Sequence, residues 1–363
     1  MTEMTTMGKL VRRMQQTLIK VYKRVSGITE TVTKKLKNMQ VQRWLSEKAK
    51  TEEEVQQKLR EIDERVFNAV LGELDGGHCP GEELVDGPVP ALKDGDIPGE
   101  PDEAPHARAL RMDLGSCYIQ DHDEDSHFVH AEAGVVGVAD GVSAFRKKGV
   151  DAGAFARALM DNAFASASRA ATRHPGTPIC PYTLLRKAYS KAVRSRTPGA
   201  STAVIVSLHD TTLKWAYVGD SGFAVLRGGK IAHRSAPQQH QFNCPFQLRA
   251  SKGGDRVADA AVGEMAVAEG DVVVVGTDGL FDNVFDEELE RVVRNGTKLG
   301  LSPQDMADNV AATACEMARR RLAHSPFSIE SWRQGMEGKK RFYGGKVDDI
   351  TVVVAYVVPS DCN

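Results

Sequence analysis

Apolar residues follow two different periods along this chain. Between residues 8 and 75 they recur about every 3.6 positions, as at Leu10, Met14 and Leu18, with charged residues between them. That spacing is typical of amphipathic helices. From about residue 107 onward, short apolar runs rich in Val and Ile alternate with longer helical segments, which predicts strands and helices in alternation. The predicted strands occupy 128–139, 201–208, 213–218, 223–226, 265–276 and 350–358.

The helices predicted in this second part are 151–171, 183–195 and one that begins at Ser302. Ser302 suits the position before a helix, and Pro303 suits its first turn. The segment GDSG between 213–218 and 223–226 predicts a tight hairpin. Strands that follow one another so closely favour antiparallel sheets covered by helices, which is an α+β fold.

The stretch 76–106 differs from both of its neighbours. It is rich in Gly and Pro, and residues 72–106 hold ten Asp or Glu against the single Lys93. Such a composition predicts a solvated linker, although an acidic segment could also cover a basic cleft. We therefore predict a helical N-terminal extension at 1–75, a linker at 76–106 and a folded domain at 107–363.

Overall composition restricts the classes of function and the compartment. The 363 residues carry a formal net charge of -2, which gives no electrostatic case for binding nucleic acid. No apolar stretch approaches the roughly 20 residues of a membrane span. Six cysteines without a CxxC pair predict reduced thiols in an intracellular protein of the cytosol or nucleus. Residues 1–40 hold nine Lys or Arg against two Glu, so organelle import stays open, as does a partner helix packed on residues 8–75.

Four apolar runs carry an aspartate at or beside one end. They read VVGVADG, WAYVGDSG, VVVVGTDG and VDDITVVV, and the aspartates are Asp140, Asp220, Asp278 and Asp348. A single Asp-Gly after a strand is more often a turn than a ligand. Several carboxylates converging at a sheet edge repel one another unless a cation lies between them. Oxygen ligands without a cysteine cluster favour Mg²⁺ or Mn²⁺, so the repeated pattern predicts an acidic site for more than one metal ion.

The motifs that surround these aspartates resemble those of a known family. In chain order they read EDSHFV, VADGV, STAVIV, YVGDSGFAVLR, VVVVGTDGLFDNV and GGKVDDITVVV. Six motifs in this order, over roughly residues 112–358, resemble the metal-dependent protein phosphatases of type 2C, including the plant members. The resemblance implies a four-layer α/β/β/α sandwich, with two antiparallel sheets face to face and helices outside. It also implies a protein serine/threonine phosphatase with two Mn²⁺ or Mg²⁺ ions and a third, weaker one.

The resemblance assigns expected roles to individual residues. Asp140 would bridge both ions, the carbonyl group of Gly141 would hold the second, and Asp278 and Asp348 would complete the first. Asp220 would help to bind the third ion. Three further carboxylates would act mainly through metal-bound waters or from behind the direct ligands: Glu124, Asp125 and Asp349. Such a centre activates water for direct attack on a phosphoester, so no covalent intermediate is needed.

Two positions depart from the pattern of the family. Val142 stands where many relatives have a histidine that protonates the leaving group, and Gln120 stands where many have an arginine that clamps the phosphate. Candidates that could replace the acid are His122, His127 and His130. Candidates for the clamp are Arg146, Lys147 and Lys148. A basic cluster before Asp348 could bind an acidic phosphoprotein segment or lie in a solvated loop: Lys339, Lys340, Arg341 and Lys346.

Two alternatives to an active phosphatase of this type stay open at this point. Val142 and Gln120 are compatible with a pseudoenzyme that binds phosphoproteins without hydrolysing them. The segment GTDGLFDN by itself also resembles a phosphatase with an aspartyl nucleophile, but that chemistry needs a second Asp two residues after Asp278, where this chain has Leu280. Nothing in the sequence identifies the phosphoprotein substrate.

Overall fold

The computed structural model describes residues 109–334 and 342–360, all of which belong to one compact unit of the chain, 98–363. The predicted N-terminal helices and the predicted linker lie outside the described residues, as do Lys339, Lys340 and Arg341. Within the described ranges, no helix combines the length and the hydropathy that a bilayer span requires.

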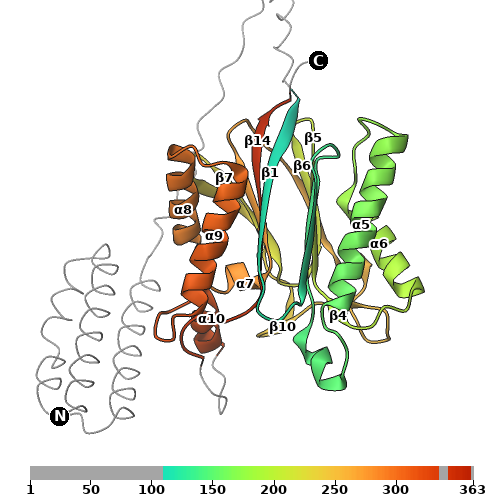
Figure 1. The fold of residues 1–363 in the computed structure, drawn as a ribbon, viewed down its shortest axis with the longest axis vertical. Helices are drawn as coiled ribbons and strands as arrows, with labels where there is room; N and C mark the ends of the chain where they lie inside the picture. The colour runs from blue at the N-terminus through green and yellow to red at the C-terminus, as the bar shows by residue number, and fades with distance from the viewer. Residues whose placement is uncertain (1–108, 335–341, 361–363) are drawn as a thin grey trace, which may run out of the picture. The chain divides into compact units, whose positions relative to one another are not determined.

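Two five-stranded antiparallel sheets form the centre of this unit (Figure 1). The first sheet has the strand order β1-β14-β13-β7-β8. Its strands are β1 (Leu110–Ile119), β14 (Ile350–Pro359), β13 (Val272–Gly276), β7 (Gly222–Arg227) and β8 (Lys230–Arg234). The second sheet has the order β12-β6-β5-β3-β2. Its strands are β12 (Ala261–Ala266), β6 (Thr212–Val218), β5 (Ala203–His209), β3 (Val135–Asp140) and β2 (Asp125–His130).

Helices cover the outer faces of both sheets (Figure 1). On the second sheet, α5 (Ala154–Arg173) packs on β2 and β3, and α6 (Pro181–Arg194) packs on β5 and β6. On the first sheet, α9 (Pro303–Ala318) packs on β1 and β14, next to α8 (Asp286–Lys298). The remaining described elements are short: η1 (Ser143–Lys148), β4 (Ala200–Ser201), β9 (Gln239–Gln241), β10 (Cys244–Pro245), β11 (Leu248–Arg249), η2 (Val257–Asp259), α7 (Asp278–Phe281) and α10 (Pro326–Arg333).

Three layers of apolar side chains hold the four layers of backbone together. In β13, Val272 and Val274 point into the cluster beneath α8 and α9, whereas Val273 and Val275 point into the cluster between the sheets. The third cluster lies between the second sheet and the helices α5 and α6, and Ile205 of β5 belongs to it. Because successive side chains of a strand face opposite sides, a strand buried on both faces needs a continuous apolar run. This requirement explains the Val-rich runs of the sequence.

The predicted α+β fold and its four-layer sandwich are confirmed. The predicted start of α9 is also confirmed, because Ser302 Oγ accepts a hydrogen bond from the Asp305 N–H. Two predicted strands are in fact pairs. The run 128–139 is the hairpin of β2 and β3, which turns at Gly134 with a φ of 57°. The run 265–276 contains β12 and β13, which lie in different sheets. The strand β1 was not predicted.

The predicted hairpin at GDSG is wrong. β6 pairs with β5 and β12 in the second sheet, whereas β7 pairs with β13 and β8 in the first. The segment GDSG therefore crosses from one sheet to the other. Gly219 makes the crossing possible with a φ of 103°, and a Cβ there would lie 2.6 Å from Thr202 Cγ2. The crossing places Asp220 between the two sheets. A hairpin would instead have left Asp220 at the edge of one sheet.

Candidate active site

Asp125 and Asp140 face each other across the last pair of the β2–β3 ladder. The hydroxyl of Thr277, which precedes α7, donates a hydrogen bond of 2.7 Å to Asp125 Oδ2. The Asp140 N–H donates to Thr202 Oγ1 over 3.1 Å. Burial raises the pKa of both carboxyl groups well above the usual range, and the charge of Asp278 raises both further. The two strands of the second sheet thus present a pair of carboxylates to the first sheet.

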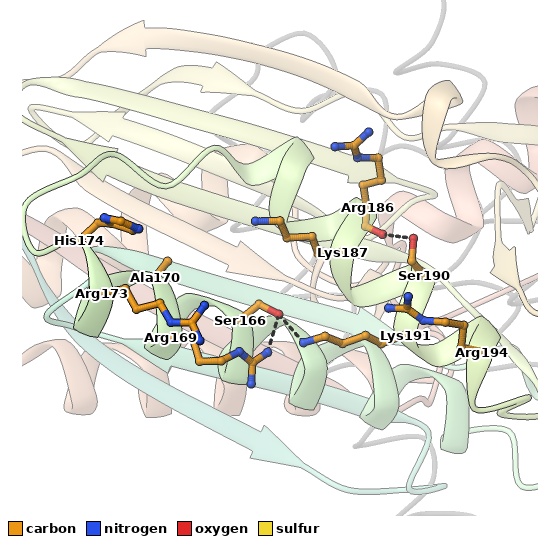
Figure 2. A pocket seen from close by; sticks show the side chains of 10 residues that line it. All are labelled: Ser166, Arg169, Ala170, Arg173, His174, Arg186, Lys187, Ser190, Lys191 and Arg194. Atoms are coloured by element: carbon orange, nitrogen blue, oxygen red, sulfur yellow. Dashed lines mark hydrogen bonds between the residues drawn. The ribbon is translucent and has the colours of Figure 1, made fainter.

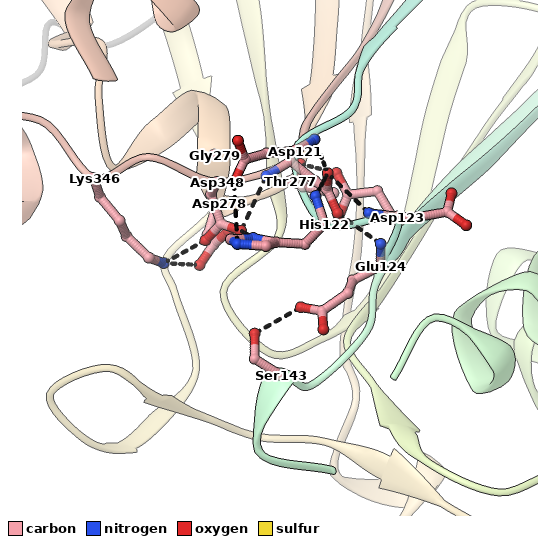
Figure 3. Close-up of polar contacts among 12 residues, drawn as sticks. Asp121, His122, Asp123, Glu124, Ser143, Thr277, Asp278, Gly279, Lys346 and Asp348 are labelled. Atoms are coloured by element: carbon pink, nitrogen blue, oxygen red, sulfur yellow. Dashed lines mark hydrogen bonds and ion pairs between the residues drawn. The ribbon is translucent and has the colours of Figure 1, made fainter. Parts of the chain in front are cut away.

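Asp278 and Asp282 come from α7 and the residue that follows it. They are four positions apart, which puts both side chains on one face of a helical turn. The Lys346 ammonium group contacts Asp278 Oδ2 and lies 3.3 Å from Asp348 Oδ2 (Figure 3). It also lies 2.8 Å from Asp282 Oδ2. The Lys346 side chain is only 15% exposed, so this is a largely buried cluster of three carboxylates around one cation.

The pKa shifts in this cluster show how strongly the charges act on one another. Burial alone would lower the pKa of Lys346, but the three neighbouring carboxylates outweigh it, and the pKa lies well above its ordinary value. Burial and the charge of Asp278 raise the pKa of Asp348 to about 7. Burial raises the pKa of Asp282 to about 6, although Lys346 opposes the shift. One ammonium group therefore compensates the negative charge of the cluster only in part.

Asp220 reaches the same cluster from the crossing between the sheets. Its Oδ2 accepts a hydrogen bond of 2.8 Å from the Gln239 side chain, while its buried Oδ1 has no partner. Burial and then the charges of Asp278 and Asp282 raise the pKa of Asp220 to about 7. The charges of Asp278 and Asp348 both raise the pKa of Asp140, which shows that these three carboxylates repel one another. The structure thus gathers Asp140, Asp220, Asp278 and Asp348 in one region.

Glu124 immediately precedes β2 and contacts the segment that follows Gly141. Ser143 Oγ donates a hydrogen bond of 2.6 Å to Glu124 Oε2 (Figure 3), and Arg146 Nε lies 2.6 Å from Glu124 Oε1. The Glu124 side chain is 3% exposed and that of Arg146 is 42% exposed. Gly141 lets these segments approach, because a Cβ there would lie 2.8 Å from the Glu124 carbonyl oxygen. Glu124 therefore ties the Asp-Gly loop to the start of β2.

Asp349, which we predicted to act through metal-bound water or from behind the direct ligands, holds a loop of the site. Its Oδ1 accepts hydrogen bonds from the N–H groups of Asp121, His122 and Asp123, and its Oδ2 accepts one from the Glu124 N–H. Burial alone would raise the pKa of Asp349, but these four donors together lower it below its usual value. The carboxylate of Asp349 thus fixes the loop 121–124, which carries Glu124 and His122 into the site.

The structure separates the candidates for the proton donor. His122 lies in the site, with its Nδ1 4.0 Å from Asp348 Oδ1 and its Nε2 3.1 Å from Asp121 Oδ2. His127 pairs instead with Ser116 of β1 over 3.2 Å, and the ring of His130 packs on Phe164 of α5. His122 is therefore the candidate that the structure places beside the carboxylates.

Arg146 is the corresponding candidate for the phosphate clamp because its guanidinium group contacts Glu124. The Lys148 ammonium instead lies over the Phe145 ring, 5.2 Å from its centroid, and the Lys147 side chain is exposed. Lys346, for which we predicted either a solvated loop or contact with a phosphoprotein, lies among the site carboxylates.

The donor set fits hard divalent cations. The buried, unpartnered Oδ1 atoms of Asp278 and Asp220 are oxygen donors that need a positive partner. Among the described residues, no three His, Cys, Asp or Glu side chains already stand in a closed metal-binding geometry. Instead, the Lys346 ammonium lies between Asp278, Asp282 and Asp348 and contacts all three.

Asp282 and the position of Lys346 were not predicted as parts of the site. The spacing of Asp282, one helical turn after Asp278, was a usable signal for the first of them. For Lys346 the sequence offered only a basic cluster near Asp348.

Comparison with known proteins agrees with this geometry. No family model matches the chain. It is 56% identical over 256 residues to the putative protein phosphatase 2C 23 of Oryza sativa subsp. japonica, covering 70% of this chain and 77% of the relative. It is 57% identical over 271 residues to the putative protein phosphatase 2C 24 of the same species, covering 75% and 84%. This chain belongs to the protein phosphatase 2C family.

A solved structure of the same class agrees with the fold. The photosystem II phosphatase PBCP is 33% identical to this chain, with a TM-score of 0.58, and the match covers 68% of this chain and 98% of PBCP. The predicted enzyme class, a metal-dependent serine/threonine protein phosphatase, is confirmed by these relatives, and nothing among them favours a pseudoenzyme.

Proposed function

We propose that this phosphatase hydrolyses phosphoserine and phosphothreonine in proteins, with Asp140, Gly141, Asp278 and Asp348 holding two Mn²⁺ or Mg²⁺ ions. The observation that carries the proposal is the gathering of buried and half-buried carboxylates from four separate segments, with one lysine to balance them. Asp220, with an unpartnered oxygen in the same cluster, would help to hold a third ion. Bound ions of this kind make water a nucleophile at neutral pH and neutralise charge on the phosphoryl oxygens.

The residues of the chain set up this chemistry in separate ways. Asp349 fixes the loop 121–124, and Glu124 joins that loop to the Asp-Gly segment. We assign Arg146 to phosphate binding, because its guanidinium is held at Nε by Glu124 while its side chain stays 42% exposed. We assign Glu124 and Asp125 to positions behind the direct ligands, and the hydrogen bonds that each accepts from a neighbouring hydroxyl group support this assignment.

The central test is the substitution Asp140→Asn. It keeps the shape of the side chain and removes the charge that would bridge two ions, so we expect Mn²⁺-dependent release of phosphate from a phosphothreonine peptide to be lost. Thermal unfolding in EDTA should show that the variant stays folded, because neutralising a carboxylate with a raised pKa relieves repulsion. Wild-type turnover by Asp140→Asn would contradict the binuclear assignment.

We assign the protonation of the leaving group to His122, because its ring lies against Asp121 and near Asp348. A general acid contributes about 10²–10⁴ in rate, and a leaving group of low pKa needs less of this help. His122→Gln should therefore lower kcat on a phosphothreonine peptide by about 10² and change turnover of p-nitrophenyl phosphate only slightly.

His130→Gln is the matched control for this prediction. His130 belongs to β2 but packs on Phe164, so the substitution should leave both rates unchanged. An equal loss with both substrates in His122→Gln would mean that His122 positions other residues and donates no proton to the leaving group.

A further inference from the structure

The two helices on the outside of the second sheet form a basic pocket between them. The buried side chains of α5 recur at Ala156, Leu159 and Ala163 and face the sheet, and α6 turns Leu184 and Leu185 inward in the same way. The faces of α5 and α6 that lie next to each other line a cavity of about 560 Å³. Six Arg or Lys side chains and His174 belong to this lining (Figure 2): Arg169, Arg173, Arg186, Lys187, Lys191 and Arg194.

The positive charge of this pocket is not compensated. Within the described part of the chain, no Asp or Glu lines the cavity, and none forms an ion pair with any of the six cations. Ser166 Oγ instead accepts hydrogen bonds from Lys191 Nζ at 2.8 Å and from Arg169 at 3.3 Å (Figure 2). Burial and the charges of Arg169, Arg194 and Lys187 lower the pKa of Lys191. These cations repel one another, and an anion between them would relieve that repulsion.

Helix ends explain only part of the pattern. Arg173 stands in the last turn of α5, and Lys191 and Arg194 stand in the last turn of α6, where cations interact favourably with the helix dipole. Lys187 stands in the middle of α6, and Arg169 lies a full turn before the end of α5. The helix dipole therefore does not explain why Arg169 and Lys187 converge on the same cavity as the last-turn cations.

The lining also indicates the chemistry of the ligand. Several cations around a small volume match a compact ligand with several negative charges, and Arg and Lys are the usual partners of phosphate groups. Among the residues that the structure describes, no Phe, Tyr or Trp lines the cavity, so a nucleobase would find no ring there to stack on, and Ala170 is the one apolar lining residue. The volume falls within the usual range of small-molecule pockets.

We propose that the pocket between α5 and α6 binds a compact small molecule with several phosphate groups, such as an inositol polyphosphate or a phosphoinositide headgroup. This site belongs to elements that carry none of the carboxylates of the active site. The proposal therefore does not depend on the proposed function.

Isothermal titration calorimetry of the full chain tests the proposal with inositol 1,4,5-trisphosphate in buffer without divalent cations, so that no metal bridges ligand and protein. The double variant Arg169→Gln/Lys191→Gln should bind at least about tenfold more weakly, because it removes two charge-assisted contacts. The control Lys252→Gln/Lys298→Gln removes the same charge from exposed positions outside the pocket and should change affinity by less than about twofold. Wild-type turnover of p-nitrophenyl phosphate in both variants would show that the active site is intact.

Two further binding measurements distinguish a lipid headgroup from a soluble ligand. Stronger binding to vesicles with 5% phosphatidylinositol 4,5-bisphosphate than to phosphatidylcholine vesicles, lost in the double variant, would support a lipid headgroup. Binding of the free trisphosphate alone would support a soluble ligand. The proposal fails if both double variants lose affinity equally, or if the trisphosphate binds no more tightly than inorganic phosphate. It also fails if the wild-type protein binds a doubly phosphorylated peptide but not the trisphosphate.

Discussion

The ammonium group of Lys346 lies among Asp278, Asp282 and Asp348, and it is the described cation in contact with all three. Buried carboxylates without a partner are unstable, so Lys346 makes the metal-free arrangement possible. A divalent ion bound to Asp278 and Asp348 would compete with it for the same oxygens. At the scale of the residue, one lysine therefore connects the stability of the metal-free protein to its affinity for metal.

Substitution of Lys346 by Met should lower the stability of the metal-free protein. Removing one partner of a buried ion pair typically costs about 3–5 kcal/mol. We expect a lower Tm in EDTA and a larger rise of Tm on addition of Mn²⁺ than in the wild-type protein, because the carboxylates then lack their internal cation.

The substitution Lys230→Met provides the control for this comparison. Lys230 also forms an ion pair, with Glu290 at 2.7 Å, but its side chain is 72% exposed. An exposed pair contributes about 0–1 kcal/mol. Equal values of Tm for Lys346→Met and the wild-type protein in EDTA would show that Lys346 does not balance the cluster.

At the scale of the element, the crossing between β6 and β7 decides which residues reach the site. Its backbone turns at Gly219, and Asp220 follows directly. The segment is held by the Gln238 side chain, whose amide oxygen accepts a hydrogen bond of 3.1 Å from the Gly219 N–H. The same four residues arranged as a hairpin would pair β6 with β7 and place Asp220 away from Asp278.

Gly219→Ala tests the constraint on this crossing. The left-handed conformation costs a non-glycine residue about 1–2 kcal/mol, and here a Cβ would also lie 2.6 Å from Thr202 Cγ2 and 2.7 Å from the Phe246 carbonyl oxygen. We expect a loss of at least about 3 kcal/mol in the free energy of unfolding in urea.

Gly176→Ala is the matched control for the crossing. Gly176 has a φ of 75°, but no atom lies within 4 Å of its added Cβ. Only the conformational cost of about 1–2 kcal/mol remains. If the two variants lost equal stability, the close contact with Thr202 would have no energetic consequence.

At the scale of the whole molecule, the carboxylates connect metal, pH and folding. They come from both sheets and from the crossing, so they are close together only in the folded state. In the unfolded chain an aspartate has a pKa of about 3.9. In the folded chain the pKa values of Asp220 and Asp348 rise to about 7, and that of Asp282 rises to about 6.

The metal-free protein should therefore lose stability as the pH rises from 5 to 7. In this window these carboxyl groups bind more protons in the folded state than in the unfolded state, so their contribution to the free energy of unfolding falls with pH, by an amount on the order of a few kcal/mol. His127, His233 and His324 have pKa values that burial lowers, so their contribution rises with pH and offsets part of this fall. Asp349 also has the opposite sign, but it acts only near and below about pH 4 because its pKa is lowered. Urea unfolding at several pH values in EDTA measures the slope.

Saturating Mn²⁺ should reduce or reverse this slope, because metal ions bind the deprotonated carboxylates. The double variant Asp220→Asn/Asp348→Asn should show a flatter slope in EDTA than the wild-type protein, since two of the titrating groups are gone. An equal slope in the wild-type protein and the double variant in EDTA would contradict the proposed mutual repulsion of the carboxylates, because the contribution of the histidines is common to both proteins.

The sequence by itself was enough for the fold class and the carboxylates. Runs such as Val272–Gly276 must be buried on both faces, and their aspartates must lie where a strand ends, because both features depend on the local period. The order of the motifs then identified the family. Local pattern also set the start of α9 at Ser302, since a cap acts within one turn.

Other features depended on the tertiary structure, because they join segments far apart in the chain. Whether GDSG forms a hairpin or crosses between sheets depends on the partners of β6 and β7, and pairing is not encoded in four residues. The N–H groups that Asp349 binds lie more than 220 positions away along the chain, so its partners could not be read from the sequence. Lys346 and the basic pocket likewise acquire their surroundings only when distant elements pack together, since charges interact through space and not along the sequence.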